Sequence, residues 1–211
     1  MVASMADTRS CLRLDQAKAG AARAKAEALA SATTVGSRRS CTFDPTTRMK
    51  PCFQATQAWC WATSISELAF FYNATKTDCA STECSVVSHD LQQQCCPKGT
   101  SVACDWHGAR DAEEIARAAN TFIPGHNFSA VHEPPSEDEL VAVLMAGKPL
   151  IIGMQWDHSS GGHAMVLGGC RAGPFGTVEY AIHDPEGKKW EWMDYQMVLK
   201  PPMMTWVNAV F

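Results

Sequence analysis

Apolar side chains in the middle of the chain recur every three or four residues. From Cys60 onward the apolar positions are Trp61, Ile65, Leu68, Ala69 and Tyr72. Positions three and four apart lie on one face of an α-helix, so this run predicts a helix with one buried face, from Cys60 to about Tyr72. The preceding residues, 41–53, contain two prolines and no such period. Irregular chain is expected there.

Two shorter helices are marked by capping residues rather than by apolar spacing. Asp111 is followed by acids in what would be a first turn, which indicates a short helix. Ser136 and Glu139 have the spacing of a capping box. We expect Ser136 to be the N-cap of a helix that ends at Gly147.

The last third of the chain has the pattern of an antiparallel sheet. The apolar run over residues 150–156 predicts one strand, and further strands are expected over 164–167, 177–183 and 190–195. The connecting turns contain Gly173-Pro174 and Glu186-Gly187. Helices come first and strands second, which is typical of an α+β fold with a cleft between the two layers.

Cys60 is placed where a thiolate would be stabilised. The free N–H groups and the positive end of the dipole at a helix N-terminus favour the ionised form of a cysteine. A lone cysteine is as often an inert core residue. A catalytic role therefore requires partners elsewhere in the chain.

Candidates for these partners lie downstream and just upstream of Cys60. His163 follows two glycines at the start of an apolar strand, and Asp184 ends another strand before a Pro/Gly turn. If the two strands pair, Asp184 could accept a hydrogen bond from His163 while the other ring nitrogen faces Cys60. The Gln54 amide and the Cys60 N–H could stabilise an oxyanion. The side chains of His183 and Asp184 would point to opposite faces of the sheet, because side chains alternate along a strand.

These residues give the chain a resemblance to the papain-like cysteine peptidases, and among them to the compact bacterial and effector-type branch with a Cys-His-Asp triad. The resemblance covers about residues 50 to 200 and rests on Gln54 six residues before the cysteine, Cys60-Trp61-Ala62, Gly162-His163 and Asp184-Pro185. The larger enzymes usually have asparagine in place of Asp184. They also often carry a cysteine where this chain has Gln57, so the disulfide built from it is absent here, and their cysteine-to-histidine spacing is longer.

The resemblance implies a papain-like fold and hydrolysis of peptide bonds. Cys60 would form the thioester, His163 would act as acid and base, Asp184 would orient it and Gln54 would complete the oxyanion hole. No cofactor or metal is implied. A non-catalytic effector module that binds a protein partner, and a thiol-dependent acyltransferase or peptide-processing enzyme, are alternatives on the same fold. Activity that requires Cys60 would exclude the first, and products formed with an added amine would reveal the second.

Length and charge set the organisation of the chain. With 211 residues, of which 46% are hydrophobic, it can bury one core. We expect a peptidase domain over residues 41–211 after a flexible, basic, alanine-rich extension over residues 1–40, which could be a tail, a prosegment or a targeting leader. The net charge of −4 gives no reason to expect a nucleic-acid partner. No signal peptide and no membrane-spanning run are visible. We expect a monomer that acts on protein or peptide substrates.

Half of the ten cysteines lie in an insertion over residues 79–104 with a polar, turn-rich composition: Cys79, Cys84, Cys95, Cys96 and Cys104. The resemblance favours disulfide bracing. A zinc site with His89 or His107 and reduced, inert thiols are the alternatives. If Cys60 is free, nine cysteines remain, so at least one more is unpaired within a monomer. Disulfides would favour an oxidising compartment, yet no leader for one is visible, and the localisation stays open.

Overall fold

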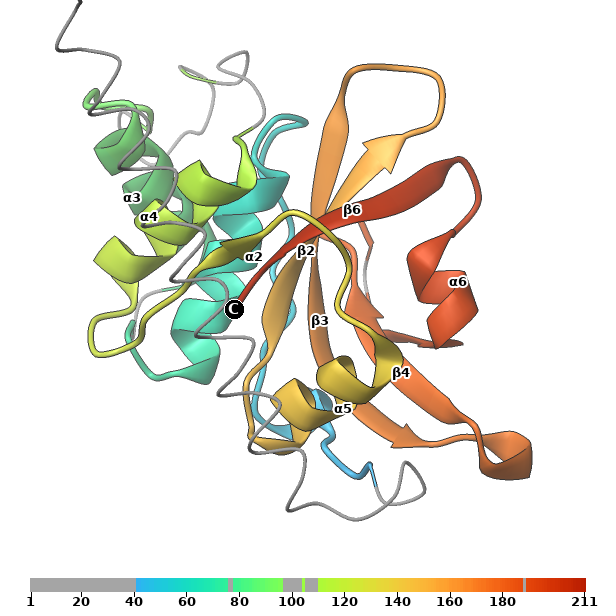
Figure 1. Cartoon of the computed structure of the whole chain (residues 1–211). Helices are drawn as coiled ribbons and strands as arrows, with labels where there is room; N and C mark the ends of the chain where they lie inside the picture. Colours follow the sequence, from blue (N-terminus) through green and yellow to red (C-terminus); the bar gives the residue numbers. More distant parts are fainter. Residues whose placement is uncertain (1–40, 76–77, 97–103, 105–109, 188) are drawn as a thin grey trace, which may run out of the picture.

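The computed structural model describes residues 41–75, 78–96, 104, 110–187 and 189–211. A layer of helices lies on one side of a single β-sheet (Figure 1). This layer contains α2, Cys60–Phe71, α3, Cys79–Asp90, and α4, Ala112–Phe122, and a short 3-10 turn, η2, Pro45–Thr47, precedes it in the chain. The predicted extension over residues 1–40 lies outside the described residues.

The sheet has six antiparallel strands in the order β1-β6-β2-β3-β4-β5. Their bounds are Ala130–Val131, Leu150–Trp156, Gly162–Ala172, Val178–His183, Glu191–Asp194 and Met204–Val210 for β1 to β6. Two more helices, α5, Glu137–Met145, and α6, Tyr195–Leu199, belong to the part of the chain that forms the sheet. The predicted α+β class is confirmed.

Strand β2 is covered on both faces over residues 150–154, and this explains why no polar residue interrupts it there. Ile151 packs into the cluster formed with α2 and α4, whereas its neighbour Ile152 packs with residues of α5 and α6. Both side chains are at most 1% exposed. Successive side chains of a strand point to opposite faces, so a strand covered on both sides has no polar positions to alternate with.

Local signals placed the capped helices correctly. Asp111 caps α4 and accepts from the Glu114 N–H at 2.8 Å. Ser136 caps α5 with the reciprocal contacts of a capping box to Glu139. The predicted helix at Cys60 is α2, and the expected pairing of the two strands that carry His163 and Asp184 is present between β3 and β4.

Several expected boundaries were wrong. The insertion over 79–104 is not only loop, because its first half is helix α3, capped by Asp78. Its exposed positions are polar and only four of its residues are buried, so no apolar period marked it. Strand β3 is longer than the expected 164–167, and the expected strand over 190–195 gives way to α6 at Tyr195. Strand β6 was not predicted. It is held in the sheet between β1 and β2 by long-range pairing.

The cysteines of the insertion are in disulfides. The bonds are Cys52–Cys79, Cys84–Cys96 and Cys95–Cys104, and a fourth bond, Cys41–Cys170, lies outside the insertion. They leave no thiol of the insertion for a zinc ion, so the zinc and reduced-thiol alternatives are wrong. Cys60 is the free cysteine among the described residues, and Cys11 lies outside them. No helix in the described ranges is long and apolar enough to cross a membrane.

Candidate active site

Cys60 is the first residue of α2, and its sulfur lies against the start of β3. The Cys60 Sγ accepts from the Ala164 N–H at 3.4 Å, and the Ser64 hydroxyl donates to the Ala164 carbonyl at 3.4 Å. The first N–H groups of a helix have no acceptor within the helix, so the Cys60 N–H is available to a ligand. The residue is 6% exposed. The helix therefore presents its N-terminal thiol beside His163, the residue before Ala164.

His163 and Asp184 meet because of the register between β3 and β4. Val166 is paired with His183, so Asp184 lies diagonally across from His163 on the same face of the sheet. The His163 Nε2 is 2.7 Å from the Asp184 Oδ1. The ring is also hydrogen-bonded to Cys60. With Nε2 engaged by the carboxylate, the other nitrogen, Nδ1, is the one left for the sulfur.

These contacts favour the charged forms of both partners. Burial alone would lower the pKa of His163, but hydrogen bonds to Asp184 and Cys60 and the charges of these two groups raise it to about 10. Burial tends to raise the pKa of Asp184, yet the hydrogen bond and charge of His163 and the Glu186 N–H hold it below its usual value. The arrangement stabilises an imidazolium, the form of histidine that pairs with a thiolate.

Gln54 lies against the turn that follows Asp184. Its backbone N–H donates to the Pro185 carbonyl at 3.0 Å, and its Nε2 donates to the Glu186 Oε1 at 3.2 Å and, more weakly, to the Gln57 carbonyl at 3.5 Å. The Glu186 N–H in turn donates to the Asp184 Oδ1 at 2.8 Å. All four residues singled out in the sequence are thus connected, three through side-chain contacts and Gln54 through the 184–186 turn.

A family model described as papain-like cysteine protease AvrRpt2 matches residues 45–197, well over half of the chain. The chain belongs to this family. The earlier resemblance to effector-type papain-like cysteine peptidases is confirmed, and so is the assignment of the protein as a hydrolase that acts on proteins. Comparison with curated proteins finds no match.

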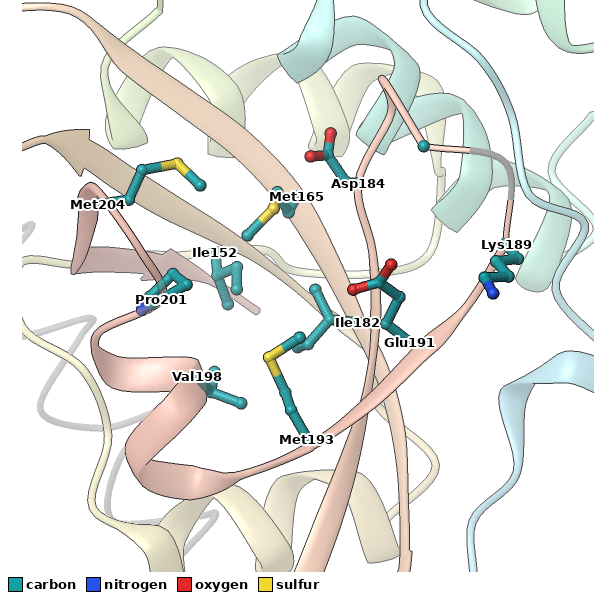
Figure 2. A pocket seen from close by; sticks show the side chains of 11 residues that line it. Ile152, Met165, Ile182, Asp184, Lys189, Glu191, Met193, Val198, Pro201 and Met204 are labelled. Atoms are coloured by element: carbon teal, nitrogen blue, oxygen red, sulfur yellow. The ribbon is translucent and has the colours of Figure 1, made fainter.

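An apolar cavity of about 170 Å³ adjoins the candidate site of the protease (Figure 2). Its wall is built from β-strands and α6 and includes Ile152, Met165, Ile182, Met193, Val198 and Met204. Asp184 stands at its edge, and Lys189 and Glu191 also line it. The cavity therefore opens next to the carboxylate that holds His163, on the face of the sheet that α6 covers.

The structure adds a buried acid that was not predicted as part of the protease site. Glu67 and His183 are both fully buried, and the Glu67 Oε1 lies 2.6 Å from the His183 Nδ1. The same oxygen accepts from the Cys52 N–H at 2.8 Å. Burial raises the pKa of Glu67 despite the opposing effects of His183 and the Cys52 N–H. His183 therefore points away from Asp184, as strand alternation predicted.

A second buried acid lies on α3. Glu83 is 1% exposed, and its Oε1 accepts from the Thr63 hydroxyl at 2.7 Å and from the Ala55 N–H at 3.1 Å. Burial raises its pKa to about 7. The apolar spacing of α2 predicted a single buried face and placed Glu67 away from it, so no signal in the sequence marked this acid. No signal marked Glu83 either, because α3 itself was not predicted.

Proposed function

We propose that the protein cleaves peptide bonds through a thioester on Cys60, with His163 as acid and base, Asp184 as the group that orients it and Gln54 as an oxyanion donor. The main support is the 2.7 Å contact between His163 and Asp184 beside Cys60, a free thiol at a helix N-terminus. A thiol, an imidazole and an orienting carboxylate form the set that nucleophilic catalysis requires.

The reaction follows from these positions. The Cys60 thiolate attacks the carbonyl carbon of the substrate, and the negative charge moves to the carbonyl oxygen, where the Cys60 N–H and the Gln54 amide stabilise it. The His163 imidazolium gives its proton to the leaving amine as the C–N bond breaks. His163, now neutral, takes a proton from water, which attacks the thioester. The carboxylic acid leaves, and the thiolate–imidazolium pair is restored.

The test is labelling by an epoxide-type cysteine-protease inhibitor, followed by peptide mapping. One adduct on Cys60 is expected, together with loss of cleavage of a denatured protein substrate. Cys60→Ala should fold normally and be inactive. A label on another residue, or activity that survives in Cys60→Ala, would refute the assignment. Adding an amine during turnover separates hydrolysis from acyl transfer, because a new amide product would identify a transferase.

A further inference from the structure

The segment that carries Gln54 has no regular secondary structure, yet it is held at several points. The Cys52 N–H donates to Glu67 of α2, and the Cys52 sulfur is bonded to Cys79 of α3. The Ala55 N–H donates to Glu83 of α3 at 3.1 Å. Gln54 therefore stands between two anchored neighbours. Irregular chain is free to move unless such contacts fix it, so these anchors define where the Gln54 amide lies.

Helix α3 provides two of the anchors from one face. Cys79 and Glu83 are four residues apart, one turn along the helix, so their side chains point in the same direction. One makes a covalent bond to Cys52 and the other a hydrogen bond to Ala55. Helix α3, the first half of the cysteine-rich insertion, thus reaches residues on both sides of Gln54.

Glu83 also reaches the helix of the nucleophile. The Oε1 that accepts from Ala55 also accepts from the Thr63 hydroxyl at 2.7 Å, and Thr63 lies three residues after Cys60 in α2. A single oxygen atom thereby links the residue after Gln54 to the first turn of α2. The other oxygen, Oε2, has no hydrogen-bond partner among the described residues. Both linking bonds survive protonation of the carboxyl, because they need only an acceptor at Oε1.

A buried carboxyl with one unpartnered oxygen is costly to keep in a fold. An apolar side chain at this position would avoid that cost but would leave the Ala55 N–H without this acceptor. The contribution of the acid that is visible in the structure is the link between Ala55 and Thr63.

We propose that Glu83 is a positioning residue for the oxyanion hole: it holds the Gln54 segment against the nucleophile helix and so sets the Gln54 amide relative to Cys60. The inference rests on the proposed roles of Cys60 and Gln54. Glu83 touches neither the reacting sulfur nor His163. Its loss should therefore weaken stabilisation of the oxyanion and leave the thiolate–imidazolium pair as reactive as before.

Two substitutions of similar size separate the linking oxygen from the volume of the side chain. Glu83→Gln keeps a carbonyl oxygen at the linking position, whereas Glu83→Met has only a thioether sulfur, which is a weak acceptor. Displacing a catalytic group by about 1 Å can lower the reaction rate on the order of 100-fold. In Glu83→Met, kcat for a peptide substrate should therefore fall about 10- to 100-fold with little change in KM. Glu83→Gln should stay within about threefold of the wild type.

Alkylation of Cys60 by iodoacetamide gives a readout that does not use the oxyanion hole. The thiolate displaces iodide from a saturated carbon, and no charge develops on a carbonyl oxygen. The alkylation rate should be the same in the wild type, Glu83→Gln and Glu83→Met. A rate that falls in parallel with kcat would show that Glu83 acts on the nucleophile or on the fold as a whole, and would overturn the proposal. An unchanged kcat in Glu83→Met would overturn it too.

Gln54→Ala distinguishes failure of this inference from failure of the proposed function. It should lower kcat about 100- to 1000-fold, and Glu83→Met added to it should cause no further loss, because there is no amide left to position. Additive losses would refute the positioning role and leave the oxyanion role of Gln54 intact. Wild-type kcat in Gln54→Ala would overturn the oxyanion role and the positioning role together.

If Glu83→Met does not fold, Thr63→Val tests the same link. Valine has the shape of threonine and lacks the hydroxyl that donates to Glu83. A loss of about three- to tenfold in kcat with unchanged alkylation is expected, because one of the two bonds of the link remains. Wild-type kcat in this variant would overturn the proposal.

Discussion

Replacing Glu83 by glutamine should change how the stability of the fold depends on pH. Burial raises the pKa of this carboxyl from 4.5 to about 7, and the hydrogen bonds from Thr63 and Ala55 only partly oppose it. Between these two values the folded protein keeps a proton that the unfolded chain has lost. Stability should therefore fall as the pH rises from about 4.5 to about 7 and level off above that range. Glutamine removes this dependence while keeping the acceptor.

The size of the effect follows from the same values. The interval between 4.5 and about 7, at about 1.4 kcal/mol for each pH unit, corresponds to a total of about 3 kcal/mol. Because part of the change has already occurred at pH 5, the free energy of unfolding should fall by roughly 2 to 3 kcal/mol more in the wild type than in Glu83→Gln between pH 5 and pH 8.

Urea unfolding at the two pH values, with the disulfides intact, measures this difference directly. Glu191→Gln, at an exposed position, is the control for loss of one carboxylate. The reasoning would be refuted if the wild type and Glu83→Gln differed in free energy of unfolding by the same amount at pH 5 and at pH 8. It would mean that Glu83 does not hold a proton more tightly in the folded state.

Two other predictions concern the candidate triad and the disulfides. Asp184→Asn should retain more activity than Asp184→Ala, because its amide oxygen can still accept from the His163 Nε2. In pH profiles of kcat/KM for Asp184→Asn, the alkaline limb should move to lower pH than in the wild type. The reason is that the Asp184 charge, which helps to raise the pKa of His163 to about 10, is gone. Equal activity of the two variants would argue against an orienting hydrogen bond. The Cys41–Cys170 disulfide joins residues 129 positions apart in the chain. Replacing both cysteines by serine removes this cross-link and should lower the free energy of unfolding by about 3 to 5 kcal/mol in urea titrations. Unchanged stability would show that this bond does not constrain the unfolded chain.

The candidate triad was within reach of sequence analysis because each member has a strong local signature. Cys60 heads a run with helical spacing, His163 follows a glycine pair at a strand start, and Asp184 precedes a Pro/Gly turn. Each of these signals depends on residues within about one helical turn or one strand of the position. The pairing of the two strands was an inference, and the register that puts Asp184 diagonally opposite His163 appears only in the folded sheet.

The buried acids show the limit of such reasoning. Glu83 has polar neighbours along the chain, and nothing local indicates that it is 1% exposed. It is buried because α3 packs on α2, and its partners, Thr63 and Ala55, are 20 and 28 residues away. The raised pKa follows from that burial.

Local structure, in the helix that begins at Cys60 and in the capped helices, could be predicted from the sequence together with the kind of chemistry, because periodicity, caps and turns act over a few residues. Long-range folding fixed the strand register, the disulfide partners, the place of β6 and the burial of the two acids beside the Gln54 segment. These depend on contacts between residues far apart in the chain and on the loss of water around them. Neither is a property of a short stretch of sequence.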